Sequence, residues 1–347
     1  MPVCLQTKID TIFRLNFFRL HVTDNPPTLR RDLFDISLQL IPLVRLKSEI
    51  VNEQISYIMV PQIVTGFLAC ALKMLKNTFV YDFGTFRMVL DNYDPDVSRQ
   101  IQQHGWYVDE RFDIKVFRKY LRSRMTFLDL GANVGFYTFL ARSIIGKKGR
   151  VFAFEPYPRN AELVKASIRE NNYNNVTLVE AAVSDKDGKT SLYLSPDESS
   201  ENSLLELNFQ NAITVDVVTL DDYFEKKVSD TKVDFIKMDI EGSEYRAFKG
   251  MSKLISCNER MTLMLEFWPN GFRRDNQDPY EFLKTIDKSG FDMQFIDNVK
   301  QKVIKVGVEQ MKRIEKERMK DVSIQNEVMR SWGWYTNLLC TRGGIRK

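Results

Sequence analysis

Histidine is scarce in this sequence, and cysteine is scattered. Among 347 residues there are only two histidines, His21 and His104, and four cysteines. A histidine-rich metal centre or a Ser/His triad is therefore disfavoured, because both need histidines that the main part of the chain lacks. The cysteines form no closely spaced metal-binding or redox pair, so we expect reduced thiols. We predict no metal at the functional site.

An excess of charge of one sign is also missing. The formal net charge is +4, from 50 Lys and Arg against 46 Asp and Glu. A dedicated nucleic-acid-binding protein concentrates basic residues on one face, so nucleic acid is not expected as a partner. Lys8, Asp10 and Arg14 interrupt any apolar core of a secretory signal. Together with the expected reduced thiols, this indicates a cytoplasmic protein.

One uncharged stretch, residues 54–72, is marginal for crossing a membrane. It has nineteen residues and contains Pro61 near its middle, whereas a spanning helix needs about 20 predominantly apolar residues. Buried or interfacial helices are the favoured interpretation, and peripheral contact with a membrane is the alternative. Because residues 1–77 show helical apolar spacing without strand alternation, we expect a helical N-terminal accessory region there.

Residues 78–347 are predicted to form an α/β domain, with a core that starts at about residue 124. Strands and helices alternate from Thr126 onward, which predicts a doubly wound, mostly parallel sheet with helices on both faces. The seven expected strands are residues 126–130, 150–155, 176–180, 233–238, 261–267, 291–296 and 337–341. The main expected helices are residues 135–146, 158–171, 242–256 and 279–289. Two hairpins are expected outside this sheet, at residues 79–90 and at residues 184–194 with 213–218.

The run from Thr126 to Thr138 has the pattern of a buried strand, a glycine-bearing turn and the start of a helix. Gly131 and Gly135 flank Asn133, and both residue types tolerate positive φ. Backbone amides could therefore turn toward a ligand at the helix N-terminus. Glycines that serve packing alone are the alternative.

A second strand ends on an acid, Glu155. It follows Gly131 by 24 residues, near the spacing at which a second strand offers a carboxylate to ribose hydroxyls. Two carboxylate oxygens suit two vicinal hydroxyls as hydrogen-bond acceptors. The turn and the acid together predict a site for a nucleoside cofactor.

Five stretches of the sequence, taken together, resemble one family. Asp129 to Gly135 resembles the acid-x-Gly-x-Gly-x-Gly turn of class I S-adenosylmethionine-dependent methyltransferases, with Asn133 in place of the middle glycine. With this turn, four further stretches resemble FkbM-type methyltransferases: residues 179–185, 215–224, 234–244 and 337–342. The resemblance implies a Rossmann-like sheet with an antiparallel last strand, S-adenosylmethionine as cofactor, and a hydroxyl of a small molecule or glycan as methyl acceptor.

The cofactor would lie between the first two core strands. Asp129 would accept a hydrogen bond from the cofactor's ammonium group, directly or through water, and orienting the turn is its alternative role. Thr138 would support the turn. At the end of the third strand, Ala181 and Ala182 would leave room for the flat adenine ring that the resemblance implies there.

The catalytic candidates follow the fourth and fifth core strands. Asp239 and Glu241 would face the same side if the chain stays extended there. Glu266 ends an apolar strand, where an ionised carboxylate is unfavourable unless it has a partner. One of the three acids would act as general base. For Glu266, a structural ion pair with Lys237 or Arg273 is the alternative.

Three functional hypotheses follow. The first is an S-adenosylmethionine-dependent methyltransferase that acts on a hydroxyl. The second is an NAD-dependent oxidoreductase on a related nucleotide-binding fold, which the glycine spacing and the lack of a Tyr-x-x-x-Lys pair disfavour. The third is a nucleoside-binding scaffold without turnover, docked to a membrane by residues 1–77.

Overall fold

The computed structural model describes residues 77–94, 96–105, 111–195, 199–206, 211–228, 232–325 and 333–344. All of these belong to one compact unit, which runs from Cys70 to Lys347. The expected helical region, including residues 54–72, lies outside the described residues except at residue 77. That region and its boundary therefore stay predictions. No helix among the described residues is long and apolar enough to cross a membrane.

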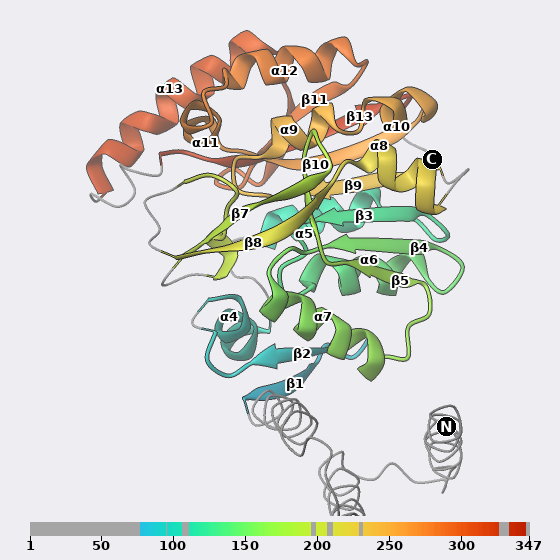
Figure 1. Ribbon diagram of the computed structural model, residues 1–347. Coiled ribbons are helices and arrows are strands. Elements are labelled where there is room, and N and C mark those ends of the chain that lie inside the picture. Colours follow the sequence, from blue (N-terminus) through green and yellow to red (C-terminus); the bar gives the residue numbers. More distant parts are fainter. Residues whose placement is uncertain are drawn as a thin grey trace, which may run out of the picture. The chain divides into compact units, whose positions relative to one another are not determined.

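An eight-stranded sheet lies at the centre of this unit (Figure 1). The strand order is β12-β11-β13-β10-β9-β3-β4-β5. The strands are β3 (Thr126–Leu130), β4 (Arg150–Phe154), β5 (Val176–Val179), β9 (Phe235–Met238), β10 (Met261–Phe267), β11 (Asp292–Asp297), β12 (Lys302–Lys305) and β13 (Thr336–Arg342). Strands β5, β4, β3, β9 and β10 are parallel, and β13 runs antiparallel between β10 and β11. All seven expected strands are present and the antiparallel last strand is confirmed, while β12 adds an eighth strand at the edge.

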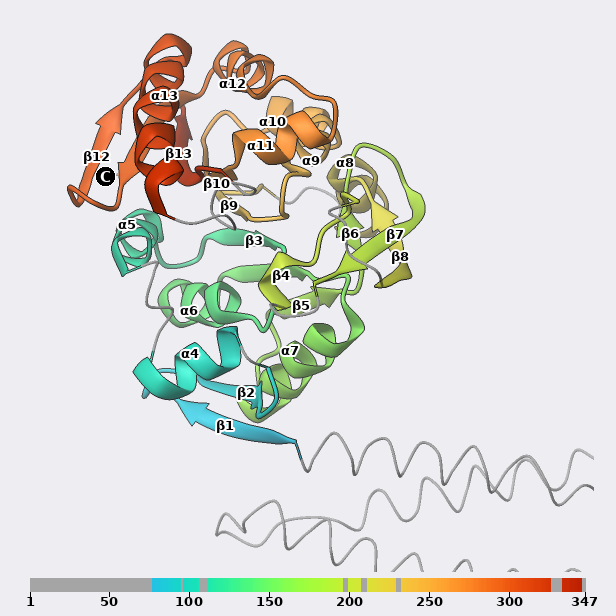
Figure 2. The same ribbon diagram turned by 90° about the vertical axis from the view of Figure 1, so that its left-hand side faces the viewer.

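Helices cover both faces of the sheet (Figure 2). One face carries the hairpin β1 (Thr78–Asp82) and β2 (Arg87–Asp91) and the helices α4 (Val97–His104), α5 (Arg111–Tyr120), α6 (Phe136–Ile145) and α7 (Pro158–Glu170). The other carries α8 (Leu220–Tyr223), which continues into η3 (Phe224–Val228), then α9 (Glu244–Lys249), α10 (Ser252–Cys257), α11 (Pro269–Arg274), α12 (Pro279–Lys288) and α13 (Val308–Gln325). Successive strand residues point to opposite faces: Phe127 packs in the first layer, and Leu128 packs in the second. The doubly wound α/β class is thus confirmed.

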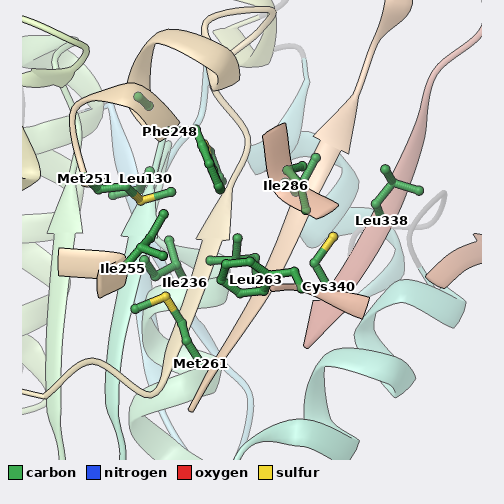
Figure 3. Packing of buried hydrophobic residues seen from close by; sticks show 14 of the residues in the cluster. Leu130, Ile236, Phe248, Met251, Ile255, Met261, Leu263, Ile286, Leu338 and Cys340 are labelled. Atoms are coloured by element: carbon green, nitrogen blue, oxygen red, sulfur yellow. The ribbon is translucent and has the colours of Figure 1, made fainter. Parts of the chain in front are cut away.

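The second face has a dense apolar core (Figure 3). Leu130, Ile236, Leu263 and Leu338 come from four neighbouring strands and meet Phe248, Met251, Ile255 and Ile286 from the helical layer. Each such side chain stabilises the fold by roughly 1.5–3 kcal/mol relative to an exposed position. This packing holds the ends of the central strands in fixed relative positions.

The expected helix 242–256 is instead two helices, α9 and α10. They meet at Gly250, which lies against the backbone of Ser184, so that a Cβ at this position would lie 2.0 Å from the Ser184 carbonyl oxygen. The close approach of two backbones therefore requires a glycine at the break between the helices, which apolar spacing alone did not indicate.

A smaller three-stranded sheet lies beside the main one, with the order β6-β8-β7. Its strands are β6 (Ala182–Val183), β7 (Gly188–Leu194) and β8 (Asn211–Val218). The antiparallel pairing of β7 with β8 confirms the expected added hairpin. The segment between them contains the short helix η2 (Ser199–Glu201), in which Ser200 donates hydrogen bonds to Asp96 beside α4.

Candidate active site

A cavity of about 720 Å³ follows the edge at which the parallel strands end. In an open α/β sheet this is the edge where ligands bind. Across the sheet from β4 to β11, the lining side chains at or just past the strand ends are Glu155, Asp129, Asp239, Glu266, Asn337 and Asn298. All eleven candidate residues from the sequence except Gly135 and Thr138 line this cavity. Those two lie in the turn and first helical residues behind it.

The glycine turn has its predicted shape but not its predicted hydrogen bonding. Gly131 and Asn133 have φ of 81° and 51°, as expected. The amides of Gly131 and Ala132 both donate to the Phe154 carbonyl oxygen, and the amide of Gly135 donates to that of Ala132. The expectation that these amides face a ligand is therefore wrong, because the protein already supplies their acceptors.

Gly131 is required by a close approach of two strand ends. A Cβ there would lie 1.9 Å from the Asp239 carbonyl oxygen. Any larger residue would push the end of β3 away from the turn that follows β9. The glycine therefore brings the predicted cofactor turn against the predicted catalytic segment.

Glu155 lies at the end of β4 and is 5% exposed. One of its carboxylate oxygens accepts from the Asn133 amide at 2.7 Å, and the other accepts from the Tyr157 amide at 2.9 Å. Each oxygen retains a second lone pair for a ligand hydroxyl. Burial raises the pKa of Glu155 to about 8, against the opposing effect of the two amides. Glu155 thus both holds the turn and lines the cavity.

Asp129 and Thr138 form a buried pair at the base of the turn. The Thr138 hydroxyl donates to Asp129 Oδ2 at 2.6 Å. Burial raises the pKa of Asp129 to about 6, while the nearby Lys237 ammonium opposes this. Thr138 therefore fixes the orientation of the acid, as its expected supporting role requires. Ala181 and Ala182 line the cavity and are almost fully buried.

The three catalytic candidates form one cluster. Asp239, Glu241 and Glu266 each place a carboxylate oxygen within 4.8 Å of the others, a spacing that would also admit a cation. Burial, and next the charges of the other acids, raise the pKa values of Glu241 and Glu266 well above the ordinary range. Among the described residues, Glu266 Oε2 has no hydrogen-bond partner. The prediction that no metal takes part stays a prediction.

Lys237 is the cation at the centre of this cluster. Its Nζ lies 2.7 Å from Asp239 Oδ2 and 4.3 Å from the centre of the Tyr137 ring. The side chain is 4% exposed, so the charge acts in a site largely shielded from water. The alternative partner of Glu266, Arg273, instead pairs with Glu315 at 2.8 Å.

Comparison with known protein families identifies the family to which this part of the chain belongs. Residues 129–293 match the Methyltransferase FkbM domain. This part of the chain is an FkbM methyltransferase domain. The match starts at Asp129 and includes Glu155 and the three clustered acids, so it covers every candidate site residue.

Several solved structures resemble the FkbM domain distantly. Precorrin-6y C5,15-methyltransferase from Geobacter metallireducens is 12% identical, with a TM-score of 0.34 over 67% of this chain and 87% of that one. Methyltransferase FkbM from Methylobacillus flagellatus is 14% identical, with a TM-score of 0.36 over 80% of this chain and 59% of that one. M. jannaschii TYW2 in complex with AdoMet is 12% identical, with a TM-score of 0.35 over 76% of this chain and 85% of that one. No curated protein sequence matches the chain. The family assignment rests on the domain match.

Acidic side chains dominate the cavity of the FkbM domain. Nine acidic and two basic residues line it, and one of the two basic residues, Arg318, pairs with Asp297 at 3.0 Å. Such an excess of acidic over basic groups, although burial raises the pKa of several of the acids, favours a cationic or neutral ligand over an anionic one. A sulfonium compound meets this condition.

Sequence reasoning missed the central role of Lys237 and did not single out Asp113, Asn298 or Asn337. The signal for Lys237 was present, since a lysine within the apolar run Phe235–Met238 needs a buried partner. Asp113 lies on the buried side of α5 and is 0% exposed. An acid among apolar helix positions is a comparable signal. The two asparagines carried no such signal in the sequence.

Proposed function

We propose that this FkbM domain transfers a methyl group from S-adenosylmethionine to a hydroxyl of a small molecule or glycan. The observation that carries the proposal is that Glu155, the glycine turn and the acid cluster line one cavity, in that order across the sheet. Neighbouring strands are about 4.8 Å apart, so the cluster lies within a nucleoside's length of Glu155.

The residues of the donor end fit this cofactor. Glu155 would accept hydrogen bonds from the two ribose hydroxyls, and Asp129 would face the ammonium group. Ala181 and Ala182 leave space for a flat base. The negative charge of the cavity stabilises a sulfonium relative to an anionic ligand.

S-adenosylmethionine supplies a methyl group that is already activated by its positive sulfur. The acceptor oxygen forms a bond to the methyl carbon while the carbon–sulfur bond breaks, which leaves a neutral thioether. The acceptor's proton passes to a carboxylate of the cluster. Glu266 is the proposed base, because its Oε2 is unpartnered among the described residues and the residue lines the cavity within the acid cluster. Lys237 holds Asp239 in place beside it.

Titration calorimetry with S-adenosylmethionine and with NAD tests the donor. We expect binding of S-adenosylmethionine only, and at least tenfold weaker binding in Glu155→Gln, because an amide group replaces one of the two carboxyl oxygens that would bind the ribose hydroxyls. Glu180→Gln is the matched control, since Glu180 is exposed and pairs with Lys165 outside the cavity. Binding of NAD without S-adenosylmethionine would favour the oxidoreductase hypothesis.

A screen of hydroxylated acceptors with labelled S-adenosylmethionine tests turnover. Glu266→Gln is expected to lower methyl transfer by about 100-fold or more, the usual contribution of a general base, with donor binding retained. Donor binding without transfer to any acceptor would support the scaffold hypothesis. Loss in Glu241→Gln alone would reassign the base. A cytoplasmic location and membrane contact through residues 1–77 stay predictions.

A further inference from the structure

A buried acid outside the matched region faces the same cavity. Asp113, in the first turn of α5, is 0% exposed and lines the cavity. Its Oδ2 accepts from Asn298 Nδ2 at 2.6 Å, and Asn337 lines the same cavity. Its Oδ1 is buried without a hydrogen-bond partner among the described residues.

This arrangement is unfavourable unless a ligand completes it. Leaving a buried acceptor unsatisfied costs about 1–3 kcal/mol, and more for a charged group. Burial raises the pKa of Asp113 to about 6, while its two asparagine partners and Lys237 favour the charged form. At neutral pH the carboxylate is therefore mostly ionised and presents one free acceptor.

Asp113 lies next to the catalytic cluster. Asn337 on β13 is the cross-strand partner of Glu266 on β10, and such partners have Cβ atoms about 4.5–5.5 Å apart on the same face. The Asn337 side chain favours the charged form of Asp113, and Asp113, Asn337 and Glu266 line the same cavity, so Asn337 links Asp113 to the proposed base. Asn298, the partner of Asp113, follows β11, which lies on the side of β10 opposite to β4 in the strand order.

Two exposed side chains with large apolar surfaces also line this cavity. Val299 and Tyr335 line the cavity and are 77% and 55% exposed, among the most exposed large apolar residues described. A cavity that offers buried polar groups together with exposed apolar surface suits a ring that has hydroxyl groups along its edge and C–H groups on its face.

We propose that Asp113 binds the methyl acceptor, with Oδ1 accepting a hydrogen bond from a second hydroxyl or an ammonium group beside the hydroxyl that is methylated. Asn298 and Asn337 are positioning residues that hold the carboxylate. The inference rests on the proposed function and adds the place of the acceptor and its chemical class. That class is a neutral or cationic polyhydroxylated ring compound, and a phosphorylated or otherwise anionic one is excluded.

Ligand-observed NMR on the full chain saturated with S-adenosylhomocysteine tests this inference. The probes are methyl hexosides, free amino hexoses and hexose 6-phosphates. We expect binding of neutral probes, amino probes or both, and none of the phosphates. In Asp113→Asn the carbonyl oxygen would take the place that faces Asn298 and the amide would turn a donor to the cavity. Probe affinity should then fall about tenfold or more.

Controls separate this inference from the proposed function. S-adenosylhomocysteine affinity should change less than twofold in Asp113→Asn, and Asp216→Asn, on the exposed face of β8, should change neither affinity. Should Asp113→Asn not fold, Asn298→Ala keeps the carboxylate and should weaken probe binding about threefold or more. Unchanged probe affinity in the folded variant, preference for the phosphates, or no probe binding to the saturated wild type would each overturn the inference. Failure of the wild type to bind S-adenosylhomocysteine would instead reject the proposed function.

Discussion

The two ends of the cavity differ in how many of their polar groups have hydrogen-bond partners within the protein. The donor end, for the methyl donor, contains Glu155, Asp129 and the glycine turn, and the acceptor end, for the methyl acceptor, contains Glu266 and Asp113. At the donor end, both oxygens of Glu155 accept backbone amides and Asp129 accepts the Thr138 hydroxyl. At the acceptor end, Glu266 Oε2 and Asp113 Oδ1 lack partners among the described residues. The donor end is therefore preorganised by internal hydrogen bonds, whereas the proposed acceptor end has two buried oxygens that a ligand with hydrogen-bond donors would satisfy.

The largest expected effect comes from Gly131→Ala, which would break the junction between the two ends. The new Cβ would lie 1.9 Å from the Asp239 carbonyl oxygen, a backbone atom that cannot turn aside. An alanine would also be strained at the φ of 81° that Gly131 adopts. Because the clash and the strain act together, we expect a loss of about 3 kcal/mol or more in unfolding free energy and loss of S-adenosylmethionine binding. Urea denaturation and calorimetry measure the two effects.

Gly84→Ala is the matched control for backbone strain. Gly84 has nearly the same φ, 78°, but no described atom lies within 4 Å of a Cβ built there. It should cost about 1–2 kcal/mol and leave donor binding unchanged. Equal losses in the two variants would mean that the approach of β3 to the Asp239 turn has no energetic consequence.

Lys237→Met tests whether one cation holds both ends together. Its removal leaves the Asp239 carboxylate, and the acids around it, without their central positive charge. Breaking a fully buried pair from one side costs about 3–5 kcal/mol. Because the Asp239 side chain is 26% exposed, we expect a smaller loss here, which should still lower the melting temperature at pH 8. The fall in melting temperature should be smaller at lower pH, where the acids are protonated.

Lys189→Met is the control. Lys189 forms an exposed pair with Asp216, so this variant should change stability by less than about 1 kcal/mol. Equal stability of Lys237→Met and wild type at pH 8 would contradict the proposed arrangement.

The pH dependence of the unfolding free energy reports on the pKa of Glu155, the acid at the donor end, in the folded and unfolded protein. The pKa of Glu155 is about 8 in the folded protein, against an ordinary value of 4.5 for a glutamate side chain. Between these values the folded state holds a proton that the unfolded state has lost. Unfolding free energy should therefore fall as pH rises through this window and level off above it. One such group contributes at most about 1.4 kcal/mol per pH unit. Glu155→Gln should show a shallower slope in ligand-free denaturation curves; equal slopes would show that Glu155 is ionised throughout.

The sequence predicted the donor end better than the acceptor end for a physical reason. The donor residues come from one continuous strand-turn-helix-strand run, where glycine spacing and a terminal acid report directly on local geometry. The acceptor end joins Asp113, Glu266, Asn298 and Asn337, whose proximity depends on sheet order. Apolar runs predicted the strands but not that order, and only the resemblance indicated the antiparallel β13.

The errors have a similar origin. The amides of the glycine turn were expected to face a ligand because the turn was considered alone, yet Phe154 and Glu155 from the next strand accept most of them. At the break between α9 and α10, Gly250 lies against the backbone of Ser184, a segment distant in sequence. Local patterns give element type, whereas the satisfaction of polar groups depends on tertiary neighbours.

Thr138→Val has the smallest expected effect and tests the preorganisation itself. Valine keeps the volume but removes the hydroxyl that donates to Asp129 Oδ2. Asp129 then loses one stabilising partner of its charged form, so its pKa should rise above about 6 and stability at pH 8 should fall by about 1 kcal/mol. Donor affinity should weaken a few-fold in calorimetry, while acceptor binding to the protein saturated with S-adenosylhomocysteine stays the same. Thr177→Val, at an exposed position of β5, is the control. If acceptor binding weakened as much as donor binding, the two ends of the cavity would share one hydrogen-bonded network, and the contrast between them would be lost.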